Sequence, residues 1–164
     1  MKIKILFICL VASTLFNSCK KDEPAASSST TTDTKTALLC GKNWMVTAST
    51  VNPGIDYYGT GILLTNLIGT VQPCELNNLL NFSTGGSYIV DEGPTKCSAG
   101  DPQTIATGTW AFNSDKSHLL VTESGSSIAD DYTLVTLNET TVQVTQTMVS
   151  GGITYVYSYT WTKQ

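Results

Sequence analysis

The sequence predicts an all-β protein, an antiparallel up-and-down β-barrel of about eight strands with a disordered N-terminal tether. From residue 104 onward, 13 of 61 residues are threonine, with valine and tyrosine between them, and these residue types favour strands. Short segments rich in glycine, serine, asparagine and aspartate cut this half at even intervals. Such short connections make successive strands antiparallel neighbours, and closure into a barrel removes the exposed edges.

The first 18 residues have the pattern of a signal peptide. Lys2 and Lys4 are followed by the nearly unbroken apolar run 5–16 and by the small residue Ser18. A run of about 12 apolar residues is too short to span a bilayer, so removal after export is the prediction.

Cys19 is the predicted lipidation site. Residues 16–19, Phe-Asn-Ser-Cys, resemble a bacterial lipobox, and residues 19–23, Cys-Lys-Lys-Asp-Glu, are similar to the start of mature Bacteroidota-type lipoproteins. That resemblance implies a protein lipid-anchored to the bacterial outer membrane and facing the cell surface, with acyl chains holding it there. The alternative is an ordinary secretory protein with a spare thiol at Cys19.

Residues 19–36 form the predicted tether. The stretch from Lys20 to Thr36 contains Pro24 and the run 27–32 of serine and threonine but no large apolar residue, so it cannot offset its ordering entropy. We therefore expect a flexible stalk that carries a single domain over residues 37–164.

Eight strands are expected in this domain. They span residues 43–51, 79–83, 87–91, 105–113, 117–123, 128–137, 141–149 and 153–162. Residues 63–70 could form one or two helical turns, and residues 36–41 a short turn closed by Gly41. A β-sandwich is the rival fold, but it needs a long connection between strands, and only 52–78 and 92–104 are long.

Alternation in the last strand places an aromatic stripe on one face, made of Ile153, Tyr155, Tyr157, Tyr159 and Trp161. This face either packs in the core or lines a ligand cavity with rings that carry polar tips. Trp110 and Phe112, and likewise Trp44 and Val46, fall on single faces that we expect to point inward.

Several motifs resemble a known family. Gly41-Lys42-Asn43-Trp44 is similar to the opening of lipocalin-like domains, one residue longer than the usual Gly-x-Trp. The order that follows is Cys74, the strand 80–82, Gly85-Gly86, Cys97 and the strand 108–112, Gly-Thr-Trp-Ala-Phe. It resembles the lipocalin-like domain of exported Bacteroidota-type lipoproteins. The resemblance covers residues 37–164 and implies a small barrel on a lipid anchor, in a family whose members mostly have no assigned ligand.

The number and spacing of the cysteines are consistent with an exported protein. Cys9 leaves with the signal and Cys19 is used for lipidation, so Cys40, Cys74 and Cys97 remain. Cys74 and Cys97 flank the same hairpin, so we expect a disulfide between them. A redox or metal pair would need a CxxC spacing or histidine neighbours. Cys40 is expected to be a buried small hydrophobe, with an intermolecular bridge as the alternative.

Charge argues against nucleic acid as a partner. The chain has nine lysines and no arginine, and without Lys2 and Lys4 the balance is 7 − 13 = −6. Phosphate recognition favours guanidinium groups and a basic surface.

The sequence offers few residues suited to catalysis or metal binding. His118 is the single histidine, no Gly-x-Ser-x-Gly elbow is present, and no glycine-rich loop for phosphate precedes a helix. Asp130 and Asp131 are adjacent in a strand and should point to opposite faces. Asp91-Glu92 are predicted to be solvated turn acids, and His118 a surface residue. We expect no catalytic residue, metal site or cofactor, and no enzyme.

Two functional hypotheses remain. In the first, the barrel mouth binds a small apolar or amphipathic molecule or a glycan fragment, through Trp110, Tyr155, Tyr157, Tyr159 and Trp161. In the alternative, side chains fill the barrel and its outer surface docks an envelope protein. The two differ in the empty volume inside the barrel.

Overall fold

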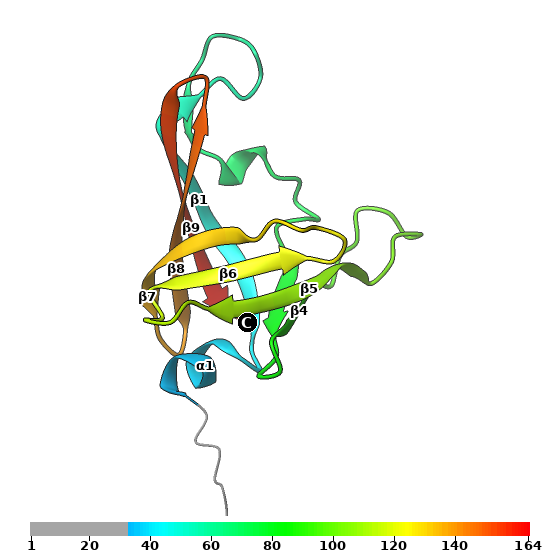
Figure 1. Ribbon diagram of the computed structural model, residues 1–164. Helices are drawn as coiled ribbons and strands as arrows, with labels where there is room; N and C mark the ends of the chain where they lie inside the picture. Colours follow the sequence, from blue (N-terminus) through cyan, green and yellow to red (C-terminus); the bar gives the residue numbers. More distant parts are fainter. Residues whose placement is uncertain (1–32) are drawn as a thin grey trace, which may run out of the picture. The chain divides into compact units, whose positions relative to one another are not determined.

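The computed structural model describes residues 33–164, which form an eight-stranded antiparallel closed barrel with one additional strand (Figure 1). The predicted fold class is therefore confirmed. The predicted signal peptide, Cys19 and nearly all of the predicted tether lie outside the described residues. The first helix already begins at Thr34, so the folded part starts before the expected boundary at residue 37.

The elements follow one another in chain order as α1 (Thr34–Leu39), β1 (Asn43–Ile55), β2 (Leu64–Asn66), the 3₁₀ helix η1 (Ile68–Thr70), β3 (Leu79–Phe82), β4 (Ser87–Asp91), β5 (Thr104–Phe112), β6 (His118–Glu123), β7 (Asp130–Leu137), β8 (Thr141–Ser150) and β9 (Ile153–Lys163). All eight expected strands are present, each starting within two residues of its expected position. The segment 63–70 differs from the expectation, since it holds the short strand β2 before its single 3₁₀ turn.

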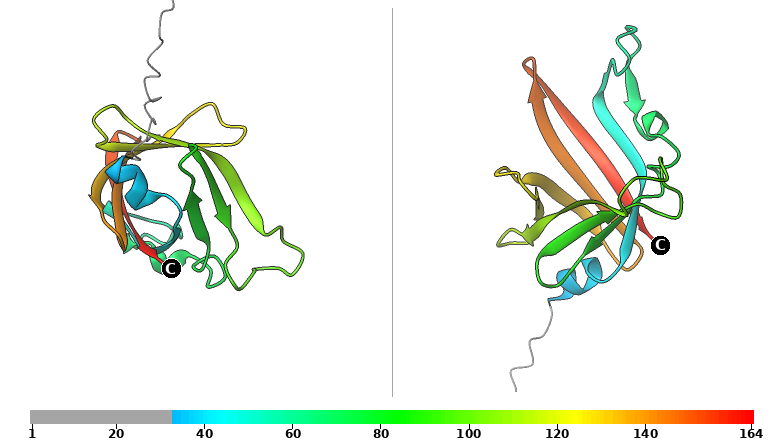
Figure 2. Two further views of the ribbon diagram at one scale, coloured as in Figure 1. Left: turned by 90° about the horizontal axis from the view of Figure 1, so that it is seen from below. Right: turned by 90° about the vertical axis from the view of Figure 1, so that its right-hand side faces the viewer.

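The strands pair in the order β2-β1-β3-β4-β5-β6-β7-β8-β9, and β1 also pairs with β9. This last pairing closes the ring, seen end-on in Figure 2, and leaves β2 outside it. Each strand of the ring pairs in antiparallel fashion with the next ring strand along the chain. The connectivity is therefore a meander, and the sandwich alternative does not apply.

Helix α1 covers one end of the barrel (Figure 1). Asp33 caps the helix by accepting the Thr36 N–H at 3.1 Å, and it pairs with Lys116 of the β5–β6 turn at 2.6 Å. Behind the helix, Trp44 is fully buried and its indole N–H donates to the Leu39 carbonyl at 2.8 Å. Gly41 makes the turn between them at φ +68°, a conformation that suits glycine. We call this the closed end.

At the opposite end the strands fan apart (Figure 2). The pairing explains this opening: β1 shares only three residue pairs with β3, against eight with β9, while β8 and β9 share ten. At this end, away from helix α1, the strands β1, β8 and β9 therefore continue beyond the ring. We call this end the mouth.

The predictions for Cys74 and Cys97 and for the burial of Cys40 are confirmed. Cys74 and Cys97 form a disulfide with a Cα–Cα distance of 5.1 Å, which joins the segment before β3 to the β4–β5 connection. Cys40 is free and buried under helix α1, and burial raises the pKa of its thiol.

One prediction about the acidic residues is wrong. Glu92 was expected to be a solvated turn acid, but it is only 8% exposed. The strand register does not end at Asp91, because the Glu92 N–H donates to the Gln103 carbonyl at 2.8 Å and the Gln103 side chain donates back to the Glu92 carbonyl. This extension continues the β4–β5 pairing past Asp91 and leaves Glu92 buried, in the lining of a pocket that also includes Glu75 and Asn78.

Candidate functional site

Aromatic rings fill the closed half of the barrel. Phe82 is their centre: it stacks on Trp161 with a centroid distance of 5.9 Å and meets Trp110 edge-on at 5.8 Å. Strand register places these rings on the inner face, since Phe82 pairs with Tyr88, and Val142 with Trp161. The expected inward packing of Trp44, Trp110 and Phe112 is confirmed.

Toward the mouth the rings leave a cavity of about 160 Å³ inside the barrel, which we call the lumen pocket. Its lining residues come from five strands, of which β7 supplies the one carboxylate: Leu80, Phe82, Tyr88, Val90, Val121, Asp130, Tyr132 and Trp161. Because an apolar cavity of about 150 Å³ holds a benzene molecule, this volume suits one ring or a short length of alkyl chain.

Gly108 helps to shape this pocket. It pairs with Tyr88 across β4 and β5, and a methyl group at this position would collide with the Tyr88 ring and with the Thr122 carbonyl. The glycine of the Gly-Thr-Trp segment therefore allows the phenol of Tyr88 to lie flat against the barrel wall.

Tyrosine hydroxyls supply polar groups to the pocket. Burial raises the pKa of Tyr132 above its ordinary value, and the nearby Asp130 carboxylate raises it further. Burial is also the main cause of the raised pKa of Tyr88 and of Tyr159, with Asp130 contributing to both. These phenols therefore stay protonated at physiological pH and can donate hydrogen bonds.

Asp130 is the carboxylate at the pocket. Its Oδ1 accepts a hydrogen bond from the Gln146 side chain at 3.0 Å. The next residue, Asp131, points to the outer surface and contacts His118 Nδ1 at 2.6 Å. The expectation that the two aspartates face opposite sides is therefore confirmed, as is the surface position of His118.

The five residues expected to contact a ligand lie at different levels of the barrel. Trp161 lines the lumen pocket, and Tyr159 packs on Tyr132 with a centroid distance of 6.1 Å. Tyr155 and Tyr157 continue along the same face of β9 toward the mouth, outside the pocket lining. Trp110 lies deeper, where its indole N–H donates to the Ser83 carbonyl at 3.0 Å.

Sequence reasoning missed Leu80, Val90, Val121, Asp130 and Tyr132 as pocket residues. The available signal was alternation: Val121, Asp130 and Tyr132 occupy the inner-face positions of their strands. It could be used only after the pairing of β6 with β7 had been fixed.

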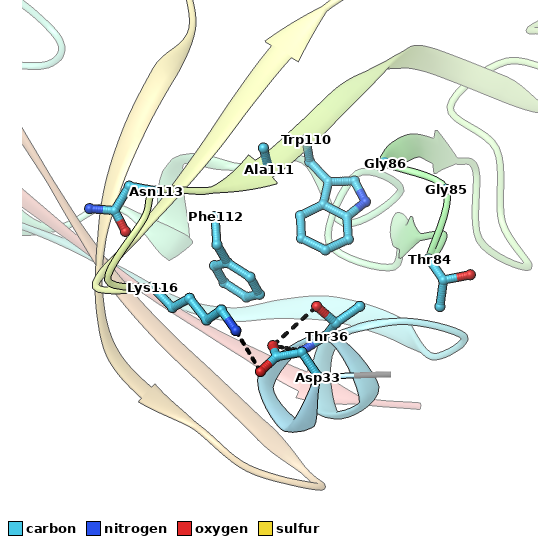
Figure 3. A pocket seen from close by; sticks show the side chains of 10 residues that line it. All are labelled: Asp33, Thr36, Thr84, Gly85, Gly86, Trp110, Ala111, Phe112, Asn113 and Lys116. Atoms are coloured by element: carbon cyan, nitrogen blue, oxygen red, sulfur yellow. Dashed lines mark hydrogen bonds and ion pairs between the residues drawn. The ribbon is translucent and has the colours of Figure 1, made fainter. Parts of the chain in front are cut away.

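A larger hollow of about 380 Å³ lies at the closed end, between helix α1 and the turns that precede β4 and β6 (Figure 3). Its charged groups already have partners. Asp33 Oδ1 pairs with Lys116, and Asp33 Oδ2 accepts from the backbone and hydroxyl of Thr36. The hollow thus belongs to the packing of the helix cap, and we place the candidate site in the lumen pocket.

Over residues 33–164, no three side chains of histidine, cysteine, aspartate and glutamate are grouped so as to hold a metal ion. None of the helices in this part of the chain is both long and apolar enough to cross a membrane. Comparison of the chain with models of protein families and with curated proteins gave no match.

Proposed function

We propose that this protein is a cell-envelope lipoprotein whose barrel binds a small amphipathic molecule. The observation that supports the proposal is the lumen pocket, an apolar cavity in a closed barrel that opens at one end only. Ligand pockets are typically concave and apolar, with a few polar groups that orient the ligand.

The lining defines the chemistry of the ligand. Rings and aliphatic side chains form the floor, so an apolar ring or alkyl segment gains by burial there. Asp130 and the phenols of Tyr88 and Tyr132 add an acceptor with negative charge and two hydroxyls. An ammonium or hydroxyl head group is the matching partner, which favours an amphipathic ligand over a glycan fragment.

Filling the pocket tests this assignment. In the full chain, Val121→Phe should weaken binding of the fluorescent probe N-phenyl-1-naphthylamine by about tenfold or more, because the added ring takes the space that the ligand needs. The matched control is Thr122→Phe, which adds the same ring on the opposite face of β6 and should leave affinity unchanged.

The head-group assignment has its own variant. Asp130→Asn should reduce competition by decylamine several-fold while leaving probe affinity unchanged. If neither compound binds the unaltered protein, the ligand-binding proposal fails. The filled-barrel alternative, in which the outer surface docks an envelope protein, would then gain support from the ring-filled closed half.

The anchoring part of the proposal rests on the lipobox-like residues 16–19 and on the lipocalin-like motifs of residues 37–164. We expect Cys19→Ala to move the protein from the membrane fraction to the soluble fraction of the producing cells, because the acyl chains would be lost. Cell fractionation followed by immunoblotting measures this, with Cys40→Ala as the control. Continued membrane retention of the Cys19 variant would count against lipidation.

A further inference from the structure

Two chain reversals form the far end of the barrel, opposite helix α1 (Figures 1 and 2). The first is the β1–β2 connection, residues 56–63, and the second is the β8–β9 turn with its flanking residues, 148–153. Both extend past Asn52 and Val156, the last residue pair of β1 and β9. We call them the two tips.

Exposed apolar side chains concentrate on the two tips. Seven of the ten large hydrophobic side chains that are exposed within residues 33–164 lie there, with exposed fractions between 48% and 71%. They are Tyr57, Tyr58, Ile62 and Leu63 on the first tip, and Met148, Val149 and Ile153 on the second. Single exposed hydrophobic residues are common on soluble proteins, but a concentration of this kind indicates a contact surface.

The two tips carry almost no charge. Residues 43–74 contain one charged residue, Asp56, and residues 140–162 contain none. The Asp56 carboxylate is used within its own loop, where its two oxygens accept the N–H groups of Thr60 and Gly61 at 2.9 and 2.8 Å. The tips therefore offer apolar contact without a free charge for an ion pair.

The first tip has a defined shape. The rings of Tyr57 and Tyr58 meet edge-on with a centroid distance of 5.0 Å. Gly59 and Gly61 follow with φ values of +66° and +81°, which glycine adopts without strain. The loop thus presents two phenols close in the chain to aliphatic side chains, a combination that suits the boundary between membrane and water.

We propose that the two tips bind the surface of a phospholipid bilayer, with Ile62, Leu63 and Val149 entering the boundary between head groups and acyl chains. A bilayer adapts to separate protrusions, so it can cover both tips without a matching shape. Neutral head groups fit best, because residues 33–164 carry 5 lysines against 11 acids, or 5 − 11 = −6, and this charge is repelled by an anionic membrane.

The tips also lie at the entrance to the lumen pocket. One face of β9 carries Ile153 at the second tip, then Tyr155 and Tyr157, and finally Trp161 in the pocket lining. This aromatic track gives an amphipathic molecule a route from the bilayer to the pocket. The route rests on the proposed function, whereas the bilayer contact does not. It is also separate from the proposed anchor at Cys19, since the described chain begins at the closed end.

Quenching of tryptophan fluorescence by brominated phosphatidylcholine tests the proposal. Trp44, Trp110 and Trp161 are each no more than 8% exposed, so a tryptophan added to the full chain at a tip reports its own surroundings. On addition of brominated phosphatidylcholine vesicles, the emission of Ile62→Trp should shift to shorter wavelength. It should also be quenched several-fold more than that of Val135→Trp. Val135 is the matched control, because it is exposed on β7 toward the closed end.

Further substitutions measure the apolar contribution. In the Ile62→Trp chain, Leu63→Ser together with Val149→Ser should weaken vesicle binding by about tenfold or more, because the bilayer would bury both side chains. Val135→Ser in the same chain should leave binding unchanged. Added salt should not weaken the binding of the Ile62→Trp chain, since the tips are uncharged.

Equal quenching at positions 62 and 135, or none at position 62, would overturn the proposal. An emission shift that depends on protein concentration in the absence of vesicles would also overturn it and assign the tips to a contact between two copies of the chain. Quenching at position 62 in a chain that does not bind N-phenyl-1-naphthylamine would support the bilayer contact and count against the route to the lumen pocket.

Discussion

Replacing Trp44 with alanine is expected to lower the free energy of unfolding by about 3–5 kcal/mol, the range for removing a large buried aromatic side chain. The ring has no exposed surface, and it belongs to the buried cluster with Leu39, Phe82 and Trp161. It also links helix α1 to β1, because its indole N–H donates to the Leu39 carbonyl. The variant should therefore lose the packing of the closed end together with the bulk of the core.

Trp44→Phe separates these contributions. It keeps most of the apolar volume but leaves the Leu39 carbonyl without its donor, and a loss of about 1–2 kcal/mol is expected from that bond and the smaller ring. Urea denaturation followed by circular dichroism measures both variants. If Trp44→Ala shifts stability no more than Trp44→Phe does, the ring does not hold the closed end as described.

Removing the disulfide is expected to have the second large effect on stability. Cys74 and Cys97 are 23 residues apart, and in the chain-entropy model a loop of this size stabilises by about 3–4 kcal/mol through the unfolded state. The double variant Cys74→Ala/Cys97→Ala should therefore unfold at a markedly lower urea concentration and show a larger m-value, since its unfolded chain is more open.

Reduction of the unaltered protein with dithiothreitol should reproduce the variant's urea midpoint. Cys40→Ala is the control for thiol chemistry, because this buried cysteine forms no disulfide. A midpoint that does not change on reduction would contradict the expected role of the bridge.

The strands could be predicted from the sequence because local signals agree with the fold. Threonine and valine favour extended backbone, and turn residues such as Gly85-Gly86 and Gly151-Gly152 lie where the chain reverses. The disulfide followed from the same reasoning, since Cys74 and Cys97 flank one hairpin. These features depend on residues that are near one another in the chain.

The far end of β1 could not be predicted in this way. The strand was expected to stop at Val51, but it continues through Pro53 and Gly54 to Ile55. Proline and glycine normally interrupt strands, yet here both lie between Thr50 and Ile55, where the register of β1 against β2 shifts, and beyond Asn52, where the pairing of β1 with β9 ends. Where the pairing of a strand shifts or ends depends on the tertiary structure, so the extension of β1 could not be predicted from neighbouring residues.

The candidate sites were predicted least well for the same reason. The lumen pocket depends on which residues of five strands face each other, and the aromatic stripe of β9 indicated only one side of it. Glu92 was expected to be a solvated acid at the end of a strand, but it is buried. It lines a pocket with Glu75 and Asn78, which are distant from it in the sequence. Neither the burial of Glu92 nor the position of Asp130 leaves a signature in neighbouring residues.

The three-pair contact between β1 and β3 makes one seam of the ring much shorter than the others that flank β1 and β9. Local opening starts where the fewest backbone hydrogen bonds must break, so this seam is where the barrel wall parts most easily. The chain that leads into β3 is the segment that carries Cys74. The disulfide thus holds the segment that enters the short pairing between β1 and β3, and its reduction is expected to ease local opening of the barrel wall there.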